Sequence, residues 1–330
     1  MTTTSLHLPE RLVRAIDALR IDRAECAVTV GDETISYDGP SQLRRDLAAA
    51  LYRHWHAGTP GNRADLPRDV RRDTAFEDVL RAATPHRTSR TAAVVRSGPL
   101  DGPFGRHVLI DVGRMRLRIP VAEAPRPLPG TGSGTHLDLP AVRPALSPGF
   151  FLVNGSAGGP GADGDILRVY VHVDEAPSAP ALWHAVLTAL EARAVPYRAK
   201  VLAKARSYPR RDAIVLYLGK ESWDAAPAAV AAVRGLPGLN RERPLLAEPV
   251  ADGVSYAWEP RDVRPGWKRM SFGQHRTALV AAGVSAHVFD GADLHQAVAD
   301  CLVEGGADPL APHRNAGGPR WAPTVSGEAG

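Results

Sequence analysis

Two hydrophobic patterns alternate along the second half of the chain. The β-branched, period-two pattern of strands occurs in residues 149–153, 166–173, 196–203 and 213–218. The helical spacing of apolar residues occurs in residues 182–193, 225–233 and 294–303. These segments predict a mixed domain of strands and helices.

The first half contains the same patterns in shorter segments. Leu12, Ile16 and Leu19 recur at helical spacing after Pro9, which suits the first turn of a helix. Further helices are predicted at residues 43–55 and 76–83, and strand pairs at residues 27–37 and 105–121. We therefore expect a smaller region of helices and strands before the main domain.

Proline and glycine dominate residues 122–146, between these two regions. We interpret this segment as a connector without regular structure. Residues 304–330 lack periodicity and are rich in glycine and proline, and we expect a disordered tail there. The predicted organisation is an N-terminal region over residues 1–121, the connector, a main domain over residues 147–303, and the tail.

Composition excludes several classes of protein. The 330 residues are 44% hydrophobic and 23% charged, as in ordinary globular proteins. Neither a signal peptide nor an apolar run of bilayer length occurs, so we expect a cytoplasmic protein. Cys26 and Cys301 are far apart, which fits a reducing compartment and excludes a cysteine-built zinc site. We interpret His54 and His56 as surface residues, because no nearby carboxylate completes a metal site.

The formal net charge is +4, and cationic side chains occur on predicted strands. In residues 167–173, period-two alternation places Arg168, Tyr170 and His172 on one face and valines on the other. For each residue alone, a solvated sheet face with long cationic stems is an equally good interpretation.

More basic residues follow on the next predicted strands. Alternation groups Arg198, Lys200 and Lys204, and a second cluster contains Arg210 and Arg211. Adjacent strands that present one sign of charge repel one another unless an anion lies between them. The combined pattern favours a phosphate-binding site.

Four blocks of the main domain carry a resemblance to a known family. They are residues 147–153, 195–202, 208–217 and 271–276. In order and spacing these blocks resemble the HopA-type effector family, which includes bacterial type III effectors and the lyase partners of class V lanthipeptide and thioamitide synthesis. The Ala-, Arg- and Pro-rich composition favours the biosynthetic branch.

The resemblance implies relatedness to phosphothreonine lyases, which break the C–O bond of a phosphoamino acid by β-elimination, without a metal or cofactor. It implies an α+β fold with a central, mostly antiparallel sheet flanked by helices. A separate Ser/Thr kinase-like protein, in a heteromeric complex, would phosphorylate a ribosomal precursor peptide, and this protein would leave dehydroalanine or dehydrobutyrine. Residues 1–121 would dock the kinase or the leader peptide.

The elimination needs a base for the Cα proton and cations for the departing phosphate. Lys200 is our choice of base, because a lysine amine can accept a proton where its surroundings favour the neutral form. Arg168, Arg211 and Arg276 are the candidates for holding the phosphate, since arginine binds phosphate in a bidentate manner. Lys204 would assist at the phosphate or at the developing enolate.

The acid is the least determined role. In relatives with a histidine acid, that residue lies two positions after a basic residue on a strand preceding the lysine, and here Tyr170 takes its place. We expect the pKa of Tyr170 to be lowered by guanidinium groups, with His172 as an alternative acid. Tyr217, Arg210 and His275 are further candidates for the wall of the pocket.

Two other functions remain open at this stage. The same basic pocket could hold a phosphopeptide without chemistry, as a binding partner of the kinase or as a type III effector-like protein. A nucleic-acid binder is the other class, but the sequence contains no nucleic-acid motif and few aromatic residues among the basic ones.

Overall fold

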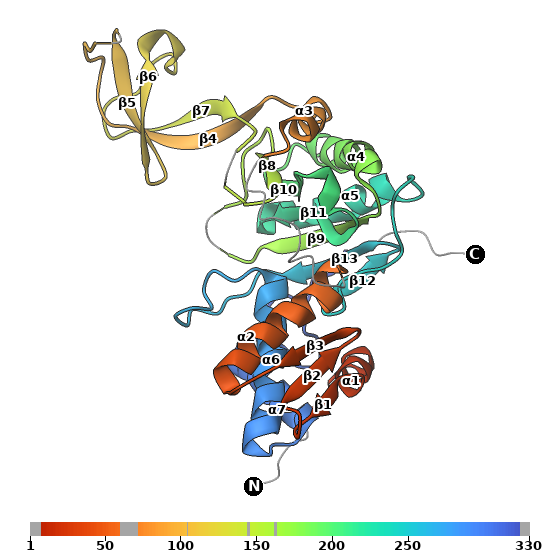
Figure 1. The fold of residues 1–330 in the computed structure, drawn as a ribbon. Helices are drawn as coiled ribbons and strands as arrows, with labels where there is room; N and C mark the ends of the chain where they lie inside the picture. The colour runs from red at the N-terminus through yellow and green to blue at the C-terminus, as the bar shows by residue number, and fades with distance from the viewer. Residues whose placement is uncertain (1–7, 60–71, 104, 144–145, 162–163, 324–330) are drawn as a thin grey trace.

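An antiparallel sheet forms the centre of the computed structural model, which describes residues 8–59, 72–103, 105–143, 146–161 and 164–323. Its strand order is β12-β13-β9-β11-β10-β8 (Figure 1). The strands are β8 (Phe150–Asn154), β9 (Leu167–Val173), β10 (Tyr197–Leu202), β11 (Arg210–Leu218), β12 (Glu248–Ala251) and β13 (Val254–Trp258). Every neighbouring pair is antiparallel, so the predicted α+β fold with a central antiparallel sheet is confirmed.

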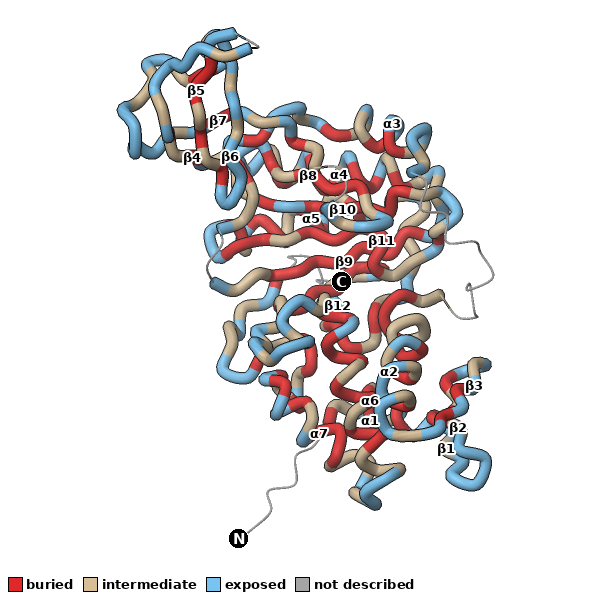
Figure 2. Tube along the Cα trace, turned by 60° about the vertical axis from the view of Figure 1, so that its left-hand side comes forward, coloured by how far each residue is buried: buried red, intermediate tan, exposed pale blue. Residues whose placement is uncertain are grey.

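One face of this sheet packs against α4 (Ala179–Glu191) and α5 (Ala226–Val233). The valines of β9 and Trp183 of α4 belong to this core, and all of them are buried. Figure 2 shows that β9 and β11 are buried along most of their length. Because successive side chains of a strand alternate between faces, the polar residues of β9 lie on the opposite side.

The opposite face meets a layer built from both ends of the described chain. Its elements are α1 (Glu10–Asp17), β1 (Arg20–Asp22), β2 (Ala27–Val30), β3 (Glu33–Ser36), α2 (Pro40–Leu51), α6 (Phe272–Asp290) and α7 (Leu294–Glu304). The π-helical segment Tyr52–Ala57 continues α2 toward the sheet. Figure 1 shows α2 beside α6 below the sheet, and the two helices are in contact. This layer shares one core with Tyr170 and Val215 of the central sheet.

A second antiparallel sheet projects from the body of the molecule (Figure 1). It contains β4 (Thr88–Val95), β5 (His107–Val112), β6 (Met115–Pro120) and β7 (Gly134–Pro140), in the order β6-β5-β4-β7. Short helical elements lie elsewhere: α3 (Thr74–Ala82) and the 3₁₀ turns Val121–Glu123, Ala176–Ser178, Ala205–Ser207 and Lys220–Ala225. The predicted hairpin within residues 105–121 is confirmed by the pairing of β5 with β6.

Two predictions about irregular segments are wrong. The connector, residues 122–146, contains β7, whose backbone pairs with β4 along its whole length. Residues 305–323 of the predicted tail are packed, with Ala307, His313 and Asn315 buried, while residues 324–330 lie outside the described part of the chain. Glycine and proline mark turns in both segments, but here these turns join paired or buried backbone. Among the described residues, no helix combines the length and apolar character that crossing a bilayer requires.

A close approach between α6 and α7 supplies a test of this packing. A Cβ atom at Gly283 would lie 2.5 Å from the Cα atom of Val298. We expect Gly283→Val to lower the free energy of unfolding by about 1–3 kcal/mol through overpacking, as measured by urea unfolding. Gly134→Val is the control, since open space surrounds that position. Equal losses in the two variants would contradict the close helix contact.

Candidate functional site

Two rows of side chains cross the face of the central sheet that looks toward α2 and α6. Tyr170 of β9 lies opposite Val215 of β11, which lies opposite Lys200 of β10. In the next row Arg168 lies opposite Tyr217, and Tyr217 lies opposite Arg198. Residues directly opposite on neighbouring strands project from the same face. The sheet therefore brings Lys200, Arg168 and Tyr170 together, as the alternation predicts.

Aromatic rings surround the Lys200 ammonium. Its Nζ atom lies 4.0 Å from the centre of the Phe150 ring and 5.9 Å from the centre of the Tyr217 ring. Both contacts have the geometry of cation–π interactions. Among the described residues, no carboxylate forms an ion pair with this half-buried lysine. Lys200 therefore lies on an aromatic surface, and within the described part of the chain its interaction with Asp212 is longer than a direct ion pair.

Arg168 also lies over the Tyr217 ring, with its Cζ atom 4.9 Å from the ring centre. The guanidinium is buried and forms an ion pair with Glu259. Burial opposes the charge, but Tyr217 and the Glu259 carboxylate hold the pKa of Arg168 well above its usual value. Arg168 therefore remains a permanent cation next to Lys200.

The buried carboxylate of Asp212 contacts several side chains near the N-terminal end of β11. Arg210 donates to both oxygens of Asp212, at 2.7 and 2.8 Å, and the Tyr52 hydroxyl donates to Asp212 at 3.3 Å. The Arg210 Cζ atom lies 5.6 Å from the centre of the Phe150 ring that also contacts Lys200. Burial disfavours the carboxylate, but Arg210 and nearby His56 and Lys200 hold the pKa of Asp212 well below its usual value. Asp212 is a permanent anion that fixes Arg210 close to Lys200.

The expected lowering of the Tyr170 pKa is wrong. The side chain is 1% exposed, and burial raises the pKa of Tyr170 more than the neighbouring Arg168 lowers it. Its hydroxyl lies close to the Arg168 guanidinium but has no hydrogen-bond acceptor among the described residues, and the hydroxyl of Ser255, its cross-strand neighbour, has no partner there. Tyr170 keeps its proton at physiological pH, and its hydroxyl is available to a new partner.

Sequence reasoning missed His56. This side chain is 4% exposed, and its Nε2 atom lies 3.6 Å from Asp212 Oδ2. Its Nδ1 atom is buried without a hydrogen-bond partner among the described residues, and its ring meets the Tyr170 ring edge-on with 5.3 Å between centres. His56 was interpreted as a surface residue because its carboxylate partner, Asp212, is distant in the sequence. The unpaired Nδ1 atom of His56 and the Tyr170 hydroxyl, which has no acceptor among the described residues, thus lie near one another. His56 is also close to the charged side chains of Arg168 and Lys200.

Arg211 and His172 lie in a neighbouring region of the structure that includes Glu242. Arg211 forms an ion pair with Glu242 at 2.8 Å and donates to the backbone oxygen of His54 at 2.7 Å. The Nδ1 atom of His172 lies 3.0 Å from the backbone oxygen of Glu242, and burial lowers the pKa of His172. Arg210, instead of Arg211, is the arginine that shares an aromatic contact with Lys200.

Arg276 and His275, at the start of α6, support the chain terminus. The Arg276 guanidinium is fully buried and donates to backbone oxygens of Pro312 and Arg314, while burial lowers the pKa of Arg276 to about 10. Its neighbour His275 contacts Asp262 at 3.0 Å. Arg276 therefore holds protein oxygens where a phosphate was predicted. Lys204 follows the end of β10 and is half-buried beside the turn Ala205–Ser207.

Comparison with known sequences identifies the family. A profile of the HopA1 effector protein family matches residues 141–314, more than half of the chain. The chain belongs to the HopA1 effector protein family. The match includes the whole central sheet and the first helix after it. Both rows of side chains on the sheet, the one with Lys200 and the one with Arg168, therefore lie within the matched residues of this HopA1 family member. No curated protein sequence matches the chain significantly.

Two solved structures are similar to this HopA1 family member. They are the effector proteins from Pseudomonas syringae pv. tomato strain DC3000 and from Pseudomonas syringae pv. syringae strain 61. Each is 15% identical, has a TM-score of 0.46 and covers 84% of this chain. The matches extend over 95% and 97% of the two solved chains, respectively.

Burial of neutral His56 predicts a pH dependence of stability. Burial, opposed by Asp212, lowers the pKa of His56 from 6.5 to about 4. The unfolded chain therefore binds the proton first as the pH falls through 6.5, and at pH 5 this group alone should cost about 2 kcal/mol of stability relative to pH 7. His56→Gln should lose less stability than the wild type between pH 7 and 5 in urea unfolding. An equal loss would contradict the buried, neutral state of His56.

Proposed function

We propose that this protein eliminates phosphate from phosphoserine or phosphothreonine in a peptide. The proposal depends on one observation: Lys200 lies half-buried on aromatic rings, beside Arg168 and Arg210, without a carboxylate partner among the described residues. A phosphate dianion placed there would meet the guanidinium groups of Arg168 and Arg210, with the Lys200 amine beside it. The family match gives an effector protein family; the lyase activity is proposed from the resemblance of the sequence blocks in residues 147–276.

In the proposed reaction the Lys200 amine accepts the Cα proton of the phosphorylated residue. The electron pair of that C–H bond forms the Cα–Cβ double bond, and the Cβ–O bond breaks. Phosphate leaves with the bridging oxygen, and the residue becomes dehydroalanine or dehydrobutyrine. Arg168 and Arg210 stabilise the negative charge that accumulates on the departing phosphate.

Tyr170 is the proposed proton donor to the bridging oxygen. A general acid must hold its proton until the bond breaks, and the raised pKa of Tyr170 ensures that it does. The hydroxyl has no competing acceptor among the described residues, and His56 lies on its edge. His172 is the weaker candidate, because its Nδ1 atom is engaged with the Glu242 backbone.

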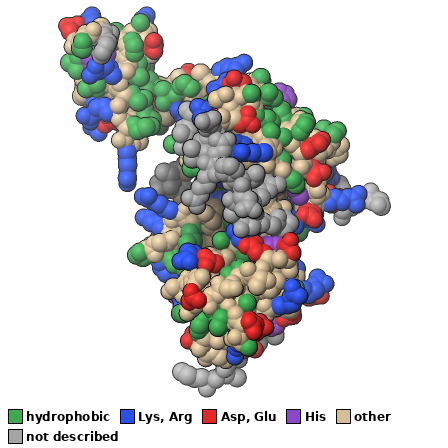
Figure 3. Space-filling model, in the orientation of Figure 1, with side chains coloured by type: hydrophobic (Ala, Val, Ile, Leu, Met, Phe, Trp, Pro, Cys, Tyr) green, Lys and Arg blue, Asp and Glu red, His purple; other side chains and the backbone are tan. Residues whose placement is uncertain are grey.

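A non-catalytic phosphopeptide-binding partner of a kinase is the second candidate. It is favoured by the ion pairs that Arg168 and Arg210 already form with Glu259 and Asp212, which reduce the positive charge available to a phosphate. Nucleic acid is the weakest candidate. On the face that Figure 3 draws, Lys and Arg side chains are interspersed with Asp and Glu, whereas a nucleic-acid surface needs a basic patch.

Mass spectrometry of a phosphopeptide distinguishes these functions. Elimination should lower the peptide mass by about 98 Da per site, the mass of phosphoric acid, whereas hydrolysis should lower it by about 80 Da. The kinase-like protein should be tested both present and absent, since the proposed partners are that kinase and its phosphorylated precursor peptide. Saturable phosphopeptide binding without any mass change, in both conditions, would leave only the binding function.

A further inference from the structure

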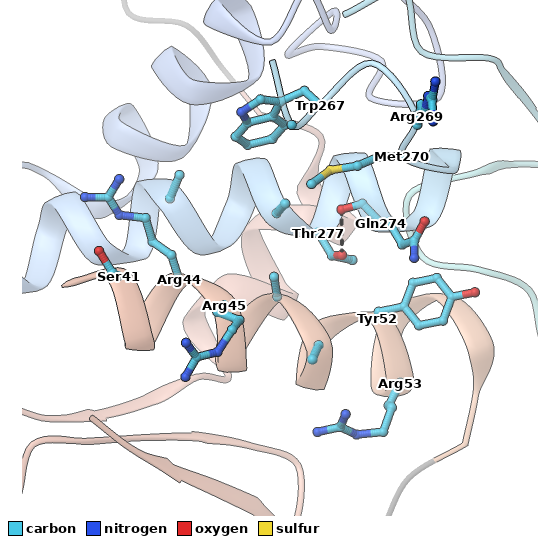
Figure 4. Close-up of a pocket in the computed structure, with 15 residues that line it drawn as sticks. Ser41, Arg44, Arg45, Tyr52, Arg53, Trp267, Arg269, Met270, Gln274 and Thr277 are labelled. Atoms are coloured by element: carbon cyan, nitrogen blue, oxygen red, sulfur yellow. Dashed lines mark hydrogen bonds between the residues drawn. The ribbon is translucent and has the colours of Figure 1, made fainter. Parts of the chain in front are cut away.

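A groove lies between α2 and α6, on the layer that covers the candidate site (Figure 4). Its volume is about 840 Å³. Small side chains form its floor: Ala48 and Ala49 from α2, and Ala278 and Ala282 from α6. Trp267 and Met270, from the loop before α6, add larger apolar surface, as Figure 4 shows. The groove is therefore apolar along its base.

The rim of the groove is positively charged. Arg44, Arg45, Arg53 and Arg269 line it, and none of the described residues that line it is acidic. Arg45 and Arg53 are paired with Asp46 and Glu33. Arg44 and Arg269 are exposed and form no ion pair with a carboxylate among the described residues, and Arg44 donates to the Ser285 hydroxyl at 3.3 Å. An occupant with acidic side chains beside an apolar stripe would satisfy both features.

The shape of the groove suits a helix. The lining positions on α2 and on the π-helical segment that continues it run from Ser41 to Arg53, which corresponds to a stripe of about 18 Å. That length accommodates about three turns of an amphipathic helix. Binding of such a helix by its apolar face in a groove is a common mode of peptide recognition.

One residue connects the groove with the candidate site. Tyr52 lines the groove, and its hydroxyl donates to Asp212 and accepts from Arg210 at 3.1 Å. Arg210 in turn shares the Phe150 ring with Lys200. A peptide bound along α2 would therefore have one end close to Arg210 and Lys200.

We propose that the groove binds an acidic, amphipathic helical segment of the same peptide whose phosphorylated residue enters the Lys200 site. The inference rests on the proposed function for the identity of the peptide. It adds a specificity requirement, because the recognised segment lies outside the reacting residue. The arginines and the apolar side chains of the groove hold the peptide. Lys200 and the arginines beside it carry out the chemistry.

Fluorescence anisotropy with designed peptides tests the groove without any turnover. The probe is a labelled helical peptide of about 18 residues, with leucine on one face and glutamate beside it, and a scrambled peptide is its control. The double variant Arg44→Glu, Arg269→Glu should weaken binding about tenfold or more. The variant Arg114→Glu, Arg118→Glu changes the net charge equally on the distant sheet of β5 and β6 and should weaken binding less than about twofold.

Three outcomes would overturn the inference. They are equal binding of the scrambled peptide, equal weakening by the two double variants, and binding only to vesicles that contain phosphatidylserine. Attaching the probe helix to a phosphothreonine peptide separates this inference from the proposed function. The groove variant should raise KM for the attached substrate and leave kcat unchanged. Peptide binding with no elimination by the wild type would remove the lyase function and leave the groove assignment intact.

Discussion

Replacing Lys200 with alanine should lower the rate of phosphate elimination by about two to four orders of magnitude. The substitution removes the amine that lies on the Phe150 ring and leaves Arg168 in place, so phosphopeptide binding should weaken much less than turnover. Phosphate release and loss of peptide mass, measured in a single turnover, report the chemical step. The other cationic side chains over the Phe150 and Tyr217 rings in the described structure are the guanidinium groups of Arg210 and Arg168, which cannot act as a base at neutral pH.

Two further variants separate charge from proton transfer. Lys200→Arg retains a positive charge over the Phe150 ring, so it should bind phosphopeptide but remain as slow as the alanine variant. Lys220→Ala removes an exposed lysine that follows β11 and should retain full turnover. Near-normal turnover in Lys200→Ala would show that another residue accepts the proton.

Replacing Asp212 with asparagine should lower the free energy of unfolding by about 3–5 kcal/mol, because Arg210 would be left buried without its counter-charge. The loss should appear as a lower urea midpoint with an unchanged slope. Without the ion pair to Asp212, the Arg210 side chain should no longer be held in one position. It should therefore bind phosphate more weakly, and elimination should slow as well.

The stabilising contribution of Asp212 to the free energy of unfolding should depend on pH in the acidic range. The folded pKa of Asp212 lies below its unfolded value of about 3.9, so its contribution is present above that pH and is lost as the pH falls toward the folded pKa. Wild type should therefore lose more stability on acidification below pH 4 than Asp212→Asn. Asp111→Asn is the control, since Asp111 likewise accepts hydrogen bonds from arginine, here from Arg96 and Arg116 on the projecting sheet. Equal effects of the two variants would contradict a special role for the buried carboxylate.

Period-two alternation predicted part of the site correctly and does not apply where the strand is irregular. It places Arg168, Tyr170 and Lys200 on one face, because β9 and β10 are regular there. In β11 the register shifts between Arg210 and Ile214, and this irregularity reverses the sides to which neighbouring residues point. Arg211 was chosen for the phosphate from the chemistry of arginine and not from alternation, and the structure places Arg210 near Lys200 instead.

Other features depend on contacts that no local pattern contains. His56 becomes a buried partner of Asp212 only because the π-helical segment after α2 packs on β11. Helix α6 was not predicted, because its own residues are small or apolar on nearly all of its faces. The periodic alternation of apolar and polar positions is weak in such a helix. The pKa of Tyr170 depends on the balance of burial and charge, and sequence alone indicates only the charge.

A phosphothreonine peptide labelled with deuterium at Cα provides the most direct test of the central claim that the Lys200 face removes a carbon-bound proton as phosphate departs. The account predicts a product that has lost the deuterium and the phosphate together, and no such product from Lys200→Ala. A product that retains the deuterium and carries a hydroxyl group would contradict it.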